Sequence, residues 1–193
     1  MQLLFISNLF PDTTHPWTGL DNATVLAALR DARPDWTIRA LSVRPSFNAA
    51  SVAALRCRKA DAWLQPQYAH TLYVPRAGGM NDRLFSMSVT HALRDQFPAW
   101  QPDAVLASWL FPDACGVHLA LPHLPQVSIA QGSDVHQYLD MPMRRQSILR
   151  LCRETSSIIT RSADLAKRLV AAGADTARIH PVYNGVDHSV FSV

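Results

Sequence analysis

The chain has little of several residue types that define whole classes of protein. Its 193 residues include three cysteines, two lysines and one glutamate, Glu154. Cys57, Cys115 and Cys152 are scattered without CxxC or Cys/His spacing, which argues against a disulfide framework or zinc module and favours a reducing compartment. No apolar run approaches the roughly 20 residues that span a bilayer, and the N-terminus lacks the features of a signal peptide. We therefore expect a cytoplasmic protein, at most peripheral on the inner face of the membrane.

Excess charge is also scarce. Lysine and arginine number 18 against 15 acidic residues, a net charge of +3. No basic run is interleaved with aromatic residues, so nucleic-acid binding is not predicted. The eight histidines show no metal-ligand spacing; His118 and His123 lack a third ligand nearby and are interpreted as structural, so we expect no metal site. A composition of 48% hydrophobic and 17% charged residues is that of a folded domain.

Short apolar runs alternate along the chain with segments of helical periodicity. The runs predict strands at 3–7, 36–43, 72–74, 104–108, 126–130, 157–160 and 179–182. The periodic segments predict helices at 21–32, 51–64, 81–97, 114–120, 145–155 and 162–172. We expect Asp21 or Asn22 to cap the first helix and Ser162 the last, with Gly173 after its end. The alternation predicts an α/β fold, a doubly wound and mostly parallel sheet flanked by helices, in one domain over residues 1–193.

Ligands of such sheets bind beyond the carboxyl ends of the strands. The loops to consider are therefore 8–20, 76–81, 109–113, 131–140 and 183–187. None of them carries GxGxxG for a dinucleotide, GxxxxGK[ST] for a triphosphate or the GxSxG of an α/β-hydrolase. A dehydrogenase, a P-loop ATPase and a hydrolase are thus disfavoured.

Two short fragments stand directly after predicted strands. Gln131-Gly132-Ser133-Asp134-Val135 combines a glycine, which permits close approach of the backbone to a ligand, with an aspartate. Asp134 could accept hydrogen bonds from sugar hydroxyls or fix the loop by accepting backbone N–H groups. The second fragment is Asn184-Gly185-Val186-Asp187. Taken alone, each is typical of an ordinary turn.

Taken in order, the fragments resemble the N-terminal domain of the retaining family-4 glycosyltransferases of the GT-B fold. The pieces that carry the resemblance are Leu4-Phe5-Ile6-Ser7-Asn8-Leu9-Phe10-Pro11, Asp103-Ala104-Val105-Leu106-Ala107-Ser108-Trp109, the 131–135 fragment, Ile158-Ile159-Thr160-Arg161-Ser162 and Val182-Tyr183-Asn184-Gly185-Val186-Asp187. They span nearly all of the chain. Within the family, the sequence looks most similar to enzymes of cell-surface polysaccharide assembly, such as the teichuronic-acid type.

The resemblance implies two Rossmann-like domains that face each other across a cleft. The N-terminal domain would hold a sugar or lipid-linked glycan acceptor, and the C-terminal domain most of the nucleotide-sugar donor. We expect that C-terminal domain to be missing from this sequence, so that the chain is inactive alone. No other cofactor and no metal is implied. The flank around 183–193 would be exposed where the second domain docks, and could support a dimer.

The resemblance also suggests site residues. Gly19 matches a glycine that lies close to the donor phosphates and the transferred sugar, although many members have two adjacent glycines there. Gln131 stands where many members carry a histidine near that sugar; glutamine can hydrogen-bond a hydroxyl but cannot be protonated. Gly132, Ser133 and Asp134 complete the motif as substrate contacts. No residue of this half is assigned as catalytic, because its task would be positioning.

Several further residues are weaker candidates for substrate contact. Trp17 and Trp109 could stack on a sugar face, the alternative for such aromatics being core packing. Arg76 could bind an acidic or phosphorylated acceptor, and Asn184 belongs to the last motif; the alternatives are a solvated arginine and a plain turn. A predicted helix carries Arg144, Arg145, Arg150 and Arg153 and could face anionic lipid or simply be solvated.

Two other functions stay open. The chain could be a stand-alone, non-catalytic Rossmann-like module that binds a sugar or nucleotide, or one subunit of a split transferase. A nucleotide-sugar epimerase is a weaker third possibility, because its acid and base carboxylates are not recognisable here. A fragment should expose an apolar flank, whereas a true module should be monomeric and bind its ligand by itself.

Overall fold

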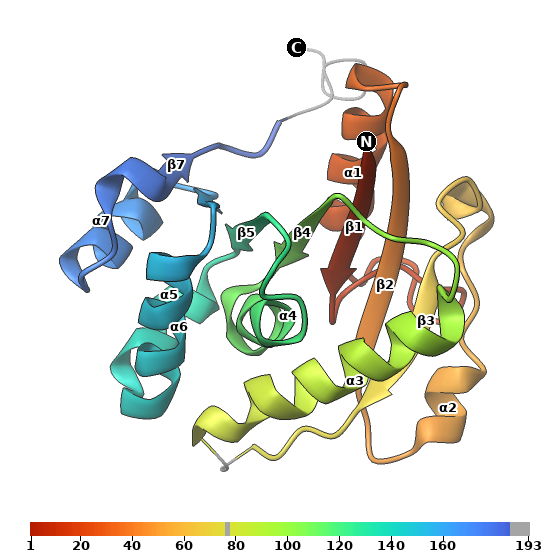
Figure 1. Ribbon diagram of the computed structural model, residues 1–193, viewed down its shortest axis with the longest axis horizontal. Helices are drawn as coiled ribbons and strands as arrows, with labels where there is room; N and C mark the ends of the chain where they lie inside the picture. The colour runs from red at the N-terminus through yellow and green to blue at the C-terminus, as the bar shows by residue number, and fades with distance from the viewer. Residues whose placement is uncertain (76–77, 186–193) are drawn as a thin grey trace.

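Seven parallel strands form a single sheet at the centre of the molecule (Figure 1). The computed structural model describes residues 1–75 and 78–185. The strand order is β3-β2-β1-β4-β5-β6-β7, which confirms the predicted α/β fold with its doubly wound parallel sheet. The strands are β1 Gln2–Ser7, β2 Thr37–Pro45, β3 Gln67–Thr71, β4 Ala104–Ser108, β5 Gln126–Ala130, β6 Ser157–Thr160 and β7 Ile179–Pro181.

Helices connect the strands and cover both faces of the sheet. They are α1 Leu20–Ala32, α2 Ala49–Ala53, α3 Asn81–Gln96, α4 Cys115–Ala120, α5 Ser133–His136, α6 Pro142–Glu154 and α7 Ala163–Ala171. Short turns of helix also occur at Lys59–Asp61, Gly78–Met80, Leu110–Ala114, Tyr138–Asp140 and Thr176–Arg178. The described part of the chain contains no helix long and apolar enough to cross a membrane.

The core has two halves because successive side chains of a strand point to opposite faces. From β1, Leu4 and Ile6 pack with side chains of α3, α4, α6 and α7 on one face. Leu3 and Phe5 point to the other face and pack with Leu26 of α1. Strands buried on both faces read as continuous apolar runs, and this is why β1, β4 and β5 were predictable.

The predicted helix at 51–64 is wrong. Only α2 and the turn Lys59–Asp61 are helical. The segment between them forms hydrogen bonds with the loop after β1 instead of continuing the helix. Cys57 forms an antiparallel bridge with Asp12, and the Arg58 guanidinium donates to the carbonyl oxygen of Pro16 at 2.8 Å. These long-range bonds form in place of the helix that the apolar periodicity predicted.

The predicted strand at 72–74 is also wrong: the third strand is Gln67–Thr71. Its last residue pairs with Pro45, the end of β2, so no partner strand remains for residues 72–74. Instead, the Asn81 side chain bonds both the N–H and the C=O of Val74, at 2.9 and 3.0 Å. An edge strand needs few apolar residues, so its position was not evident from hydrophobicity.

The helix caps agree in part with the prediction. Gly19, and not Asp21 or Asn22, is the N-cap of α1; the Asn22 side chain donates to the Leu9 carbonyl at 2.8 Å instead. The Ser162 cap is confirmed, since its hydroxyl accepts the N–H of Leu165. The helix predicted from residue 145 begins earlier, with Pro142 in its first turn.

Candidate functional site

The loops that follow β1, β4 and β5 meet at the carboxyl edge of the sheet, because these three strands are neighbours. Gly19 is where the first loop turns into α1. Its φ is 68°, and a Cβ there would lie 2.5 Å from the carbonyl carbon and oxygen of Leu9 and 2.8 Å from the Phe10 nitrogen. Only glycine fits this position, so the close turn of the loop explains Gly19 without any ligand.

A buried ion pair fixes the rest of this first loop. Asp12 is 1% exposed and accepts hydrogen bonds from the Thr14 and His15 N–H groups and from the Thr14 hydroxyl. Arg44, near the end of β2, donates to Asp12 Oδ2 at 3.0 Å and to the Phe10 carbonyl. Burial alone would raise the pKa of Asp12, but these hydrogen bonds and Arg44 lower it. The residues that hold the loop come from the loop itself and from β2, so their pairing was not predictable from the sequence.

Gln131 joins three elements at the centre of this edge. It follows β5, and its Nε2 donates to the Ser108 hydroxyl of β4 at 2.7 Å and lies 3.2 Å from Asp21 Oδ2 in the first turn of α1. Gln131 therefore contacts the first turn of α1, two residues beyond Gly19. The amide Nε2 donates hydrogen bonds to both neighbours, but a carboxamide does not ionise and cannot act as an acid or base at neutral pH.

Asp134 fixes the loop after β5. It is 0% exposed, and its two carboxylate oxygens accept the N–H groups of Gln131, Gly132 and Leu110 at 2.7 to 3.2 Å. Burial raises the pKa of Asp134, with these hydrogen bonds acting in the opposite direction. The structure thus gives Asp134 the loop-fixing role; a direct contact with a sugar hydroxyl stays a prediction.

A second buried carboxylate, Asp113, lies at the same edge. Its Oδ2 accepts the Asn8 N–H at 2.5 Å, which ties the loop after β4 to the end of β1. Burial raises the pKa of Asp113 well above its ordinary value, and the nearby charge of Asp134 raises it further. Nothing in the sequence pattern distinguished Asp113 from a loop aspartate, because its burial arises from the packing of distant segments.

An aromatic pocket opens at this edge beside the Asn8 backbone. The pocket has a volume of about 130 Å³ and lies between the ends of β1, β2, β3 and β4. It is lined by Asn8, Pro45, Thr71, Leu72, Tyr73, Asn81, Phe85, Trp109, Pro112 and Tyr138. Among the residues predicted from the sequence, only Trp109 lines it, half-buried and with a φ of 78°. Tyr73 and Tyr138 were missed because no local pattern marks them.

Arg144 stands behind this aromatic pocket and is buried, at 6% exposure. Its guanidinium group donates to the Tyr73 hydroxyl at 3.2 Å and lies 4.3 Å from the centre of the Tyr138 ring. The four arginines predicted to form one basic helix face therefore do not all share it: Arg144 points inward and Arg145 bonds the Ala172 carbonyl. Four arginines at irregular spacing on one helix point in different directions.

The remaining predicted site residues are dispersed. Trp17 is 74% exposed in the first loop. Gly132 has a φ of 146° with open space where a Cβ would lie, and Ser133 is half-buried at the start of α5. Asn184 is exposed beside an apolar groove of about 660 Å³ on the α1 face of β4, β5 and β6. Arg76 lies outside the described residues.

Metal coordination has no candidate among the residues that the structure describes: no three histidine, cysteine, aspartate or glutamate side chains gather to hold an ion. The edge instead offers backbone N–H groups, amides, hydroxyls and aromatic rings. Such groups bind neutral polyhydroxyl compounds by hydrogen bonds and by stacking, and they orient a ligand rather than attack it.

Solved structures with a similar fold include a galactosyltransferase, a protein bound to UDP-glucose and a UDP-GlcNAc epimerase. The chain superposes with a TM-score of 0.62 on the apo form of the lipopolysaccharide outer core galactosyltransferase WaaB (16% identity, 97% of this chain and 46% of that one). Anabaena Alr3699/HepE in complex with UDP-glucose gives a TM-score of 0.59 (16% identity, 98% and 45%). UDP-GlcNAc 2-epimerase from Neisseria meningitidis, bound to UDP-GlcNAc, gives 0.56 (12% identity, 95% and 47%).

The chain therefore spans about half the length of the structures it matches. At these identities the likeness shows the fold alone and does not separate transferases from epimerases. No curated protein matches the chain by sequence. The sequence profile of Glycosyltransferase Family 4, however, matches residues 49–190, well over half of the chain. The chain belongs to glycosyltransferase family 4, and its fold is the Rossmann-like α/β fold of the GT-B enzymes.

Proposed function

We propose that this chain is the acceptor-binding domain of a retaining glycosyltransferase that builds a cell-surface polysaccharide on the inner face of the membrane. The observation that carries the proposal is the aromatic pocket at the carboxyl edge of the sheet, beside the loops of Gly19 and Gln131. Family membership supports sugar transfer in general. Aromatic rings beside amide groups are suited to a sugar, since rings stack on its C–H faces and amides bond its hydroxyls.

One side chain in the pocket has an unused hydrogen-bonding group. Asn8 Oδ1 is buried and has no hydrogen-bond partner within the described part of the chain. A buried polar atom without a partner costs about 1–3 kcal/mol. A sugar hydroxyl in the pocket would donate to it. We assign Asn8 as an acceptor-binding residue, with Tyr138 and Trp109 as stacking surfaces.

The donor would approach from the other side of the same edge. There Gly19, Gln131 and the N-terminus of the 13-residue helix α1 lie together, and a helix N-terminus favours the negative charge of a diphosphate. In this proposal a second domain holds most of the nucleotide sugar, so the chain is inactive alone. The chain then contributes position and orientation, and no nucleophile.

Nuclear magnetic resonance titration of the 193-residue chain tests the proposal. Short neutral glycans and UDP-glucose are added separately. We expect the glycan to shift the resonances of Asn8, Tyr73, Trp109 and Tyr138, and Asn8→Ala to weaken its binding about tenfold without lowering the Tm. Met87→Ala, an exposed change on α3, should leave binding unaltered.

Other results would contradict the assignment. Absence of glycan binding, or shifts confined to the apolar groove beside Asn184, would refute the aromatic pocket as acceptor site. Tight binding of UDP-glucose by the chain alone, with no glycan binding, would favour the stand-alone nucleotide-binding module.

A further inference from the structure

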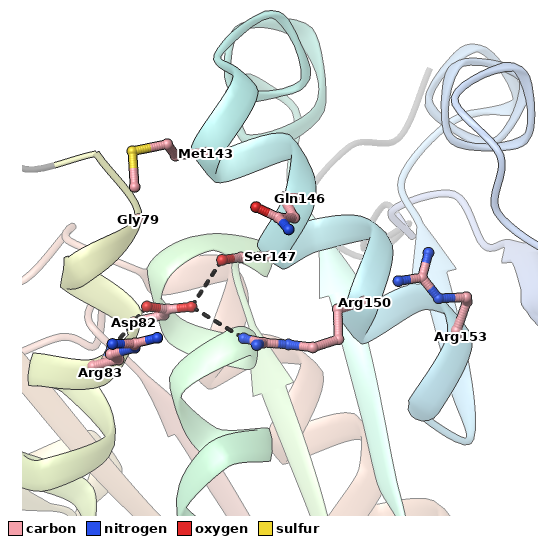
Figure 2. Close-up of a pocket in the computed structure, with 8 residues that line it drawn as sticks. All are labelled: Gly79, Asp82, Arg83, Met143, Gln146, Ser147, Arg150 and Arg153. Atoms are coloured by element: carbon pink, nitrogen blue, oxygen red, sulfur yellow. Dashed lines mark hydrogen bonds and ion pairs between the residues drawn. The ribbon is translucent and has the colours of Figure 1, made fainter.

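A second, basic groove lies away from the strand ends, between the first turn of α3 and one stripe of α6. Its volume is about 230 Å³. Gly79, Asp82 and Arg83 line it from the α3 side, and Met143, Gln146, Ser147, Arg150 and Arg153 from α6 (Figure 2). The α6 residues recur at helical spacing and form one continuous stripe. The neighbouring residue Asn81 belongs to the aromatic pocket and Asp82 to this groove, so the two sites lie on either side of the same helical turn.

The floor of the groove is rigid and polar. Asp82 is 1% exposed, and its Oδ2 accepts the Ser147 hydroxyl at 2.9 Å and the Arg150 guanidinium at 3.4 Å (Figure 2). Its Oδ1 accepts the Arg83 N–H at 2.8 Å. These bonds use the single negative charge of the groove to hold Arg150 in place.

The groove has more positive charge than this one carboxylate can balance. Arg83 and Arg153 make no ion pair with any residue that the structure describes. By contrast, Arg94 near the other end of α3 pairs with Asp95 at 2.9 Å. The N-terminus of the 16-residue helix α3 adds partial positive charge at the same place. Two unneutralised guanidinium groups beside a helix N-terminus attract an anion.

We propose that this groove binds a phosphate ester, with Arg83 and Arg153 as its charged contacts and Arg150 and Ser147 as the preorganised floor. Guanidinium groups match phosphate oxygens in geometry and stay charged at every physiological pH. The groove is open to solvent, so the phosphate enters without rearrangement of Asp82. This site is separate from the acceptor pocket and does not depend on the proposed transferase function.

The phosphate can come from two sources. A free sugar phosphate would need only the groove. An anionic lipid headgroup would also place acyl chains against the nearby methionines, and Met80 and Met143 are 54% and 59% exposed. The chemistry recognised is the same, and the two sources are distinguished by experiment.

The test uses the intact chain, with glycerol phosphate as the free probe and vesicles of phosphatidylglycerol in phosphatidylcholine as the lipid probe. Isothermal titration and vesicle sedimentation compare wild type with the double variant Arg83→Gln/Arg153→Gln. Both arginines are exposed, so the fold should persist, and a thermal melt checks this. Arg94→Gln, at the far end of α3, is a control that removes one positive charge outside the groove.

We expect the double variant to weaken binding of at least one probe by about tenfold or more, and Arg94→Gln to change it less than about twofold. Loss for glycerol phosphate identifies a small phosphate ester; loss for vesicles alone identifies a lipid headgroup. Equal losses in the double variant and the control, or no binding of either probe, would overturn the proposal. The Asn8→Ala variant should bind phosphate normally, so failure here is independent of failure at the acceptor pocket.

Discussion

The replacement of Gly19 by alanine should destabilise this protein far more than a typical glycine substitution. Gly19 has a φ of 68°, in the left-handed region, where an L residue costs about 1–2 kcal/mol. The new Cβ would also lie 2.5 Å from the backbone of Leu9. Backbone atoms cannot move aside as a flexible side chain can, so the first loop must open.

The size of the effect follows from what the opening breaks. The Asn22 side chain would lose its 2.8 Å hydrogen bond to the Leu9 carbonyl, worth about 1 kcal/mol. Relieving the overlap by shifting packed backbone costs about 1–3 kcal/mol more. With the conformational cost of the positive φ, we expect a loss of about 3–6 kcal/mol in the free energy of unfolding.

Urea unfolding followed by circular dichroism measures the loss, with Gly173→Ala as the control. Gly173 also has a positive φ, of 111°, but no atom lies within 4 Å of its Cβ position, so only about 1–2 kcal/mol should be lost. A Gly19→Ala variant that fails to fold while Gly173→Ala folds agrees with the prediction. Equal losses in the two variants would show that close approach to Leu9 is not the reason for glycine.

Three further changes have definite expected results. Arg44→Met leaves Asp12 buried without its cation and should cost about 3–5 kcal/mol in urea unfolding, whereas Arg33→Met, at an exposed pair, should leave urea unfolding almost unchanged; similar losses would contradict the burial argument. Asp113 has a raised pKa in the folded state, so its contribution to stability is complete below the unfolded pKa of about 3.9 and is lost as the pH rises through the folded pKa. Asp113→Asn should therefore become progressively more stable relative to wild type above about pH 4, and a difference that stays constant with pH would contradict the raised pKa. Ser162→Ala should lower the free energy of unfolding by about 1 kcal/mol, and no change in thermal or urea unfolding would mean that the Leu165 N–H finds another acceptor.

The site was predictable to the extent that topology determines it. Parallel strands place their following loops at one edge, so the loops after β1, β4 and β5 were identified from apolar runs alone. Gln131 and Gly19 do lie at that edge. The aromatic pocket was not predicted, because Tyr73 and Tyr138 come from segments that meet only after folding.

Local chemistry determined much of this protein by itself. The apolar runs of β1, β4, β5 and β6 specified buried strands, and Ser162 specified the start of α7, because both depend on residues a few positions apart. Tertiary structure alone decided the end of β3, where β2 offers no further partner beyond Pro45. It also decided that Arg144 is buried while Arg83 is not. The environment of a charged side chain is determined by distant segments of the chain, and no local pattern records which of them will cover it.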